Sequence, residues 1–260
     1  MGEALVSGLL AAEWAVPSDI TVAETLASRR EQLTAPGGLA SRHPGLEVRA
    51  SPAEAEGAAG AVVAVKPGDV EAAARALAGA GVGRVLSIAA GVRLARLQEW
   101  LGPGMPVVRA MPNTPALVGA GAAAIAPGDA AGEADLAWAE SILGAVGTVV
   151  RVPEPLLDAV TGLSGSGPGY IFLVAEALIE AGVLVGLPRP VSQQLAVQTL
   201  LGSARLLAES DQGPEALRAA VTSPGGTTAA GLRALEAAGV RSAFLDAVAA
   251  ATERSRALGD

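Results

Sequence analysis

The chain of 260 residues is 51% hydrophobic and 17% charged, which supports one large core or two moderate ones and excludes an intrinsically disordered protein. Its formal net charge of -8 would repel a phosphate backbone and its arginines are scattered, so we expect no nucleic-acid partner. The absence of cysteine excludes disulfides, thiolate metal sites and a cysteine nucleophile.

The first half of the chain alternates short β-branched runs with Ala-rich helical stretches, beginning with a helix over residues 1–10. Because strands that alternate with helices are typical of βαβ units, this half is expected to hold a doubly wound parallel sheet. Two of the runs are apolar almost throughout, as in strands covered by helices on both faces. The expected strands are 20–23, 47–50, 61–65, 84–88, 107–110 and 148–152.

Beyond Pro153-Glu154-Pro155 the strand pattern stops and helical patterns continue to the end. We therefore predict an α/β fold with a Rossmann-type dinucleotide-binding domain over 1–152 and an all-helical domain over 153–260. The stretch 170–185 is apolar around most of its circumference and must be covered on every side. We expect the helical domain to do this within a homodimer or a larger homo-oligomer.

The N-terminus departs from the usual start of a doubly wound sheet, which is a strand and a glycine-rich turn that binds the dinucleotide phosphates. Here a helix begins at the first residue, so we expect that the first strand is missing and that the chain begins inside this turn. Glu24 follows Gly2 by 22 residues, the spacing between the last glycine of a dinucleotide fingerprint and the acidic residue that binds the ribose. One Gly and one Glu at a tolerant spacing also arise by chance.

Few side chains are available for acid–base or covalent chemistry. The only histidine, His43, lies among Gly and Pro residues typical of a surface turn, and Lys66 is the only lysine. Any reaction must therefore use hydroxyls, carboxylates, backbone amides, Lys66 or a bound cofactor, and no metal site is expected. The longest uncharged stretch, 159–175, is interrupted by Ser, Gly and Pro, so we expect no membrane span and a cytoplasmic protein.

Three short segments combine polar side chains with Gly or Pro. Val65-Lys66-Pro67 and the segment 111–115, Met-Pro-Asn-Thr-Pro, follow strands at their carboxyl ends, where ligands of open α/β sheets bind. The segment 164–168, Ser-Gly-Ser-Gly-Pro, precedes a long apolar helix. Its glycines allow close approach either by a ligand or by a neighbouring helix, and the residues alone do not separate the two.

A fourth segment, Ser223-Pro224-Gly225-Gly226, has the composition of a tight turn and leads into a helix that Thr227 or Thr228 is expected to cap. Exposed amides at such a helix start suit a carboxylate. A capped helix without a ligand has the same pattern, so the segment alone leaves both interpretations open.

In their order and spacing these four segments resemble the pyrroline-5-carboxylate reductase family, which catalyses the last step of proline synthesis. The resemblance extends from Gly2 to about residue 254, and the segment 223–228 is its most specific part. It implies an N-terminal Rossmann domain and a C-terminal helical domain that intertwines with a second subunit. It further implies dimers that often assemble into a decamer.

The resemblance also implies roles for individual residues. Thr228 is implied as the catalytic residue, with its hydroxyl bonded to the ring nitrogen of the substrate. The residues implied at the substrate are Ser223, Gly225, Gly226, Thr227, Thr228 and Glu154, and those implied beside NADPH or NADH are Met1, Gly2, Glu24, Ser51, Val65, Lys66, Pro67 and Ala90.

Three positions depart from the family pattern. Ser51 stands where the family often has Asn, and Ala220 where it often has Asp or Asn near the cofactor. Glu24 stands where the family commonly has a small polar residue. Its carboxylate would repel the 2′-phosphate of NADPH and accept hydrogen bonds from the free 2′-hydroxyl of NADH, while Arg29 and Arg30 would offset the repulsion. The preference between the two cofactors therefore stays open.

The residues and the resemblance together predict an NAD(P)H-dependent reductase that converts 1-pyrroline-5-carboxylate to L-proline. Reduction of a cyclic imine needs a hydride donor, a fixed carboxylate and one proton, and none of these requires His or Cys. One alternative is a catalytically poor oligomeric ligand-binding protein, motivated by the expected loss of the phosphate loop. Another is a related imine or hydroxy-acid reductase, which is disfavoured because hydroxy-acid chemistry usually recruits His or Lys.

Overall fold

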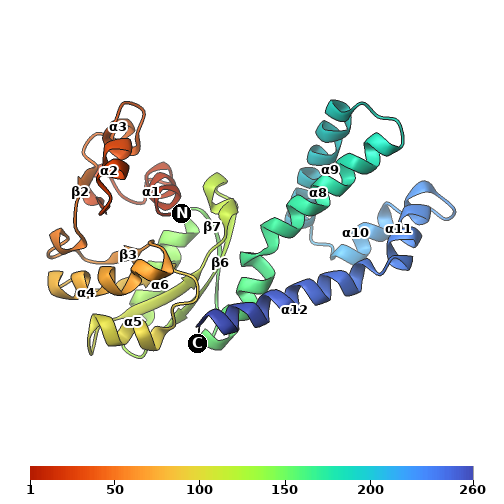
Figure 1. Cartoon of the computed structure of the whole chain (residues 1–260). Coiled ribbons are helices and arrows are strands. Elements are labelled where there is room, and N and C mark those ends of the chain that lie inside the picture. The colour runs from red at the N-terminus through yellow and green to blue at the C-terminus, as the bar shows by residue number, and fades with distance from the viewer. Residues whose placement is uncertain (260) are drawn as a thin grey trace. The chain divides into compact units, whose positions relative to one another are not determined.

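The computed structural model describes residues 1–259 and separates the chain into two compact units. The first unit comprises Met1–Ser166 and the chain from Ala250 onward, and the second comprises Gly167–Ala249. Within residues 1–259 the seven strands all lie in the first unit. The second unit is helical, and Figure 1 draws its residues 167–249 as helices joined by short connections. The expected Rossmann-type part followed by a helical part is confirmed.

The strands form two sheets. A five-stranded sheet has the order β3-β4-β5-β6-β7, and β1 and β2 form a separate parallel pair. Neighbouring strands of the larger sheet are parallel except at β5 and β6, which are antiparallel. The bounds are β1 Thr21–Ala23, β2 Glu47–Arg49, β3 Ala61–Val63, β4 Val85–Ser87, β5 Val107–Met111, β6 Gly121–Pro127 and β7 Gly147–Arg151.

Strand β6 was not expected from the sequence, and its antiparallel pairing with β5 is an addition to the predicted parallel sheet. Its residues are mostly alanines, which have little intrinsic preference for strands. The strand forms because both of its edges are paired, with β5 on one side and β7 on the other, and because Ala124, Ile125 and Ala126 are buried there. Burial of small side chains between neighbouring strands therefore outweighs local propensity.

Helices cover both faces of the larger sheet. One core cluster joins Leu97 of α5 to Leu157 of α7, and a second joins Leu5 of α1 to Ile142 of α6. Successive residues of β4 and β5 alternate between the two clusters, as the period of a strand requires. The bounds are α1 Gly2–Ala11, α2 Ala27–Thr34, α3 Leu39–Arg42, α4 Val70–Ala80, α5 Leu94–Leu101, α6 Glu133–Gly144 and α7 Leu157–Val160.

The last strand, β7, ends directly before the domain boundary that the sequence predicts after residue 152. Three short helical elements follow it, namely a 3₁₀ turn Glu154–Leu156, α7 and a π-helical turn Thr161–Gly165. Leu157 is buried in the core of the sheet-bearing unit, which explains why the turns up to Ser166 belong to that unit.

The second unit carries long helices with exposed apolar side chains. The bounds are α8 Gly167–Leu184, α9 Arg189–Glu209, α10 Pro214–Ala220, α11 Thr227–Ala237 and α12 Val240–Gly259, the last of which ends in the first unit. No residue of α8 is buried within the described chain, and Ile171, Phe172 and Leu173 are more than half exposed. Such a helix needs a partner outside this chain to cover it, as expected for a homo-oligomer.

One helical stretch, Glu154–Leu184, is long and apolar enough to cross a membrane by length and composition. The interruptions at Ser, Gly and Pro that argued against a span do not end the helical path here, because the π-helical turn carries it through 161–165. Helices that pack inside soluble proteins pass the same test of length and composition.

Candidate functional site

The residues expected beside a dinucleotide follow the carboxyl ends of parallel strands. Glu24 comes directly after β1, Lys66 follows β3 and Ala90 follows β4. Because the carboxyl ends of parallel strands share one edge of a sheet, Lys66 and Ala90 lie at the same edge, which is where open α/β sheets bind ligands. Val65, Lys66, Pro67 and Ala90 are all exposed.

Helix α1 brings a helix start suited to an anion to this edge. It begins at Gly2, so the N–H groups of its first turn have no carbonyl partner within the helix. Gly2 lies so close to the end of β3 that a Cβ built on it would be 3.2 Å from the Cβ of Ala64. Met1 contributes no side-chain cap, so these amides stay available to a phosphate.

Glu24 is turned toward its own backbone. Its Oε1 accepts a 2.9 Å hydrogen bond from the N–H of Leu26, at the start of α2. The Nη1 of Arg30 donates to the carbonyl oxygens of Glu24 and Thr25, both at 2.8 Å. Arg29 is paired with Glu3 instead. The Glu24 carboxylate therefore lies directly after β1, and the Arg30 guanidinium is bonded to the backbone carbonyls beside it, where a ribose or its 2′-phosphate would be recognised.

Ser51 is used locally, as the cap of a short 3₁₀ turn over 52–54. Its Oγ accepts from the N–H of Ala53 at 3.2 Å, and the Glu54 carboxylate accepts from the N–H of Ser51 at 2.9 Å. The turn follows β2 and thus shares the carboxyl edge of the smaller sheet with Glu24. The role of Ser51 at the cofactor stays a prediction.

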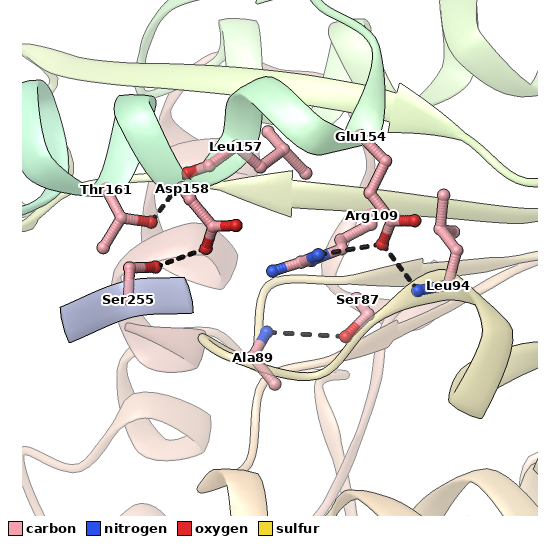
Figure 2. Close-up of polar contacts among 9 residues, drawn as sticks. All are labelled: Ser87, Ala89, Leu94, Arg109, Glu154, Leu157, Asp158, Thr161 and Ser255. Carbon is pink, nitrogen blue, oxygen red and sulfur yellow. Dashed lines mark hydrogen bonds and ion pairs between the residues drawn. The ribbon is translucent and has the colours of Figure 1, made fainter. Parts of the chain in front are cut away.

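Glu154 is held inside the first unit by two hydrogen bonds to one oxygen. Its Oε1 accepts from Nη1 of Arg109 at 2.8 Å and from the backbone N–H of Leu94 at 2.7 Å, as Figure 2 shows. Arg109 lies in β5 and its side chain is only 8% exposed, against 27% for Glu154. The carboxylate therefore neutralises a buried guanidinium and caps α5, and its expected place near the substrate stays a prediction.

Asn113 connects the end of β5 with two other segments. Its Nδ2 donates to the carbonyl oxygen of Ser164 at 3.0 Å, and its Oδ1 accepts from the N–H of Ala122 at 2.9 Å. Ser164 lies in the π-helical turn, which is closed by a 2.8 Å bond from the N–H of Ser166 to the carbonyl of Thr161. Such wide turns are frequent at functional sites.

The segment 223–226 forms the tight turn that the sequence predicts. The N–H of Gly226 donates to the carbonyl of Ser223 at 3.0 Å, and Gly225 has a φ of 69°, which favours glycine. The expected capping residue was wrong, because Gly226 is the N-cap of α11 and no side chain caps it. Thr227 and Thr228 are instead the first two helical residues, and both are exposed.

The start of α11 is therefore a second place suited to an anion. With a glycine at the N-cap, the N–H groups of the first helical turn receive no side-chain partner, and two hydroxyls lie beside them. A Cβ on Gly226 would be 2.2 Å from Oγ of Ser223 and 3.2 Å from its carbonyl oxygen, so a larger residue would require the Ser223 side chain to turn away. No group of three acidic or histidine side chains able to hold a metal occurs among residues 1–259.

Sequence reasoning placed Asn113 in a candidate segment and Arg109 in the strand before it but predicted none of their partners, and it missed the pair Asp158 and Ser255. The hydroxyl of Ser255, which is 7% exposed, donates to Oδ1 of Asp158 at 2.6 Å. An arginine within an otherwise apolar strand was a signal that could have been used for Arg109. The pairing of residues 97 positions apart leaves no such local signal.

Comparisons with known proteins agree on one family. A family model for pyrroline-5-carboxylate reductase dimerisation matches residues 154–258. A pyrroline-5-carboxylate reductase of Synechocystis is 47% identical over all of this chain and 95% of its own length. The structure of a Coxiella burnetii pyrroline-5-carboxylate reductase is similar with a TM-score of 0.91 and 35% identity, over 100% of this chain and 95% of that one. A Plasmodium falciparum pyrroline carboxylate reductase with NADP bound is similar with a TM-score of 0.84 and 30% identity, at the same coverage.

Proposed function

The chain belongs to the pyrroline-5-carboxylate reductase family, and from this premise we propose that it reduces 1-pyrroline-5-carboxylate to L-proline with NADPH or NADH. The observation that carries the proposal is the pair of helix starts without a side-chain cap, one at the strand edge and one behind the turn 223–226. The first suits a dinucleotide phosphate and the second a substrate carboxylate.

The residues at the strand edge fit a nicotinamide dinucleotide. The N–H groups at the start of α1, beside Gly2, would hold phosphate oxygens, and the small Ala64 leaves room for close backbone approach. Val65, Lys66, Pro67 and Ala90 would line the remainder of the molecule, with Ser51 and Glu24 at its ribose end. The bound dinucleotide supplies the hydride.

The turn 223–226 and the first turn of α11 would hold the substrate. Backbone N–H groups and the hydroxyls of Ser223 and Thr227 would bind the carboxylate, which orients the ring. Fixing a planar cyclic imine by its carboxylate at one end leaves one ring face open to the hydride donor.

Reduction of the imine adds a hydride to carbon and a proton to nitrogen, so one group must deliver a proton. The hydroxyl of Thr228 can donate a hydrogen bond to the ring nitrogen and pass on a proton taken from water. No histidine, cysteine or covalent intermediate is needed, which accounts for the composition of the chain.

Substitution of the two threonines separates binding from proton delivery. Thr228→Val keeps the side-chain shape and removes the donor, so we expect kcat to fall by about 100-fold, the low end for acid catalysis, because solvent can also protonate the imine. Thr227→Val should mainly raise KM for the substrate, and its surviving backbone amide limits the effect. Wild-type kcat in Thr228→Val at saturating cofactor would assign the proton to bound water.

The alternative of a ligand-binding protein without turnover is tested by the same assay. A chain that binds dinucleotide but leaves 1-pyrroline-5-carboxylate unreduced would support it.

We further propose that the self-association typical of this domain builds dimers that assemble into a decamer, in the cytoplasm. The exposed apolar residues of α8 support a subunit interface rather than a membrane contact, since they lie within the part that matches the dimerisation domain.

A further inference from the structure

Two carboxylates one helical turn apart hold different segments of the first unit. Glu154 bonds to the N–H of Leu94, the first residue of α5, while Asp158 accepts from the hydroxyl of Ser255 on α12. Figure 2 shows both carboxylates on the same short helical stretch, pointing to these two partners. The stretch 154–158 is therefore hydrogen-bonded to both the start of α5 and the end of α12.

The segment 88–93 lies between the start of α5 and the end of α12, the two places to which the stretch 154–158 is hydrogen-bonded. It connects β4 to α5, and Ala89 is tied back by its N–H, which donates to the buried Oγ of Ser87 at 3.4 Å. Gly91 has a φ of 76°, and a Cβ built on it would lie 3.6 Å from the carbonyl oxygen of Leu258. The last turn of α12 thus packs directly against the backbone of this segment.

Gly259 completes the contact. A Cβ built on it would lie 3.4 Å from the carbonyl oxygen of Gly91 and 3.1 Å from Nε of Arg93. The end of α12 can keep this position only if the helix is held, and the part-buried hydrogen bond from Ser255 to Asp158 fixes the helix one turn before Leu258. Ala90, at the centre of the segment, is exposed and belongs to the proposed cofactor site.

We propose that Ser255 is a positioning residue for the dinucleotide: through Asp158 it holds the end of α12 against Gly91 and so fixes segment 88–93 in its cofactor-binding conformation. The inference rests on the proposed function, because it takes Ala90 to line the cofactor. Ser255 touches neither substrate nor cofactor in this account. Its effect should therefore appear in dinucleotide affinity rather than in the chemical step.

The test is a fluorescence titration of NADPH and NADH into wild type, Ser255→Ala, Asp158→Ala and Asp158→Asn, with steady-state kinetics in parallel. Ser255→Ala and Asp158→Ala should each raise the dissociation constant about five- to twentyfold, while kcat at saturating cofactor and KM for the substrate stay within about twofold. Asp158→Asn should remain near wild type, because the amide oxygen still accepts from Ser255.

Ser242→Ala is the matched control, since Ser242 lies on the same helix and its hydroxyl donates to the carbonyl of Gly239 at 2.8 Å. Its affinity should equal that of wild type. A lowered melting temperature in Ser255→Ala with unchanged dinucleotide affinity would show a purely structural hydroxyl and overturn the proposal. If wild type itself binds no dinucleotide, the proposed function fails first, which is a separate outcome.

Hydrogen exchange supplies a readout that does not depend on Ser255→Ala folding fully. In Asp158→Ala, amides of segment 88–93 should exchange faster than in wild type, and bound NADPH should slow them in both. Equal exchange of this segment in Asp158→Ala and Asp158→Asn would contradict the proposed tie.

Discussion

A guanidinium buried in the middle of a sheet needs a charged partner, and Glu154 supplies it to Arg109. The same oxygen caps α5, so one carboxylate satisfies a strand and a helix start together. A substitution of Glu154 should therefore cost more stability than a substitution of an exposed acidic residue.

Removing this carboxylate should destabilise the fold. Glu154→Ala leaves Arg109 buried without a counter-charge, and we expect the free energy of unfolding to fall by about 2–4 kcal/mol in urea titrations. Glu154→Gln keeps an acceptor and should lose about 1–2 kcal/mol. In the control Glu99→Gln, which breaks an exposed pair with Arg96, the change should stay within about 0.5 kcal/mol.

The same variants test the expected role of Glu154 near the substrate. If it contacts the substrate, Glu154→Gln should raise KM at temperatures where the protein is fully folded. Wild-type stability of Glu154→Ala would contradict the importance of the Arg109 pair.

Glu24 should influence the choice of cofactor. Its negative charge, next to Arg30, opposes a 2′-phosphate, so Glu24→Ser should shift the kcat/KM ratio toward NADPH by roughly five- to tenfold. Ser can still accept from the N–H of Leu26, which keeps the turn. Glu31→Ser removes the same charge from an exposed position in α2 and is the control. An unchanged NADPH to NADH ratio in Glu24→Ser would remove this residue from cofactor selection.

Helix α11 depends on a glycine at its start. Gly226→Ala would place a Cβ 2.2 Å from Oγ of Ser223, so the Ser223 hydroxyl that we propose binds the carboxylate must turn away, and KM for the substrate should rise about tenfold. Gly231→Ala lies in the same helix with nothing within 4 Å, and should stabilise it by about 0.5–1 kcal/mol without changing KM. Wild-type KM in Gly226→Ala would argue against substrate binding at this turn.

Strand β7 is tied to α6 by charge. Hydrogen bonds from Arg151 lower the pKa of Glu133 and of Glu140 below the usual value of 4.5, and they raise the pKa of Arg151. A carboxyl group whose pKa is lower in the folded state stabilises the protein above its unfolded pKa, and this stabilisation is lost as the pH falls through the folded pKa.

Arg151→Gln should therefore lower the melting temperature at neutral pH and have a shrinking effect as the pH falls below 4.5. Differential scanning calorimetry at several pH values measures this difference. Arg75→Gln, which breaks one exposed pair with Glu71, is the control that shows how much the loss of a single surface ion pair changes the melting temperature. A difference between wild type and Arg151→Gln that is the same at every pH would rule out the two glutamates as its cause.

The elements that the sequence predicted well are those with strong local patterns. The strands around 61–65 and 84–88 were found because their residues are almost all apolar, whereas the Ala-rich β6 was missed because only pairing with β5 and β7 makes it a strand. Local turn chemistry likewise predicted the turn 223–226 but named the wrong cap for α11.

At the scale of the whole molecule, the sequence predicted two parts, the sheet-bearing one and the helical one, from the point where the strand pattern stops. The sequence did not predict contacts between distant residues, because Arg109 and Glu154 are 45 positions apart and Ser255 and Asp158 are 97 positions apart. The four motifs succeeded because each is local, and only their order along the chain identified the family.

The central claim is hydride transfer to the cyclic imine, and isotope transfer tests it most directly. The chain is incubated with 1-pyrroline-5-carboxylate and NADPH or NADH carrying deuterium at the transferable position of the nicotinamide. We predict L-proline with one deuterium on its ring carbon next to nitrogen, distal to the carboxylate, formed in step with cofactor oxidation. Cofactor binding without deuterated proline, or proline without deuterium, would contradict the account.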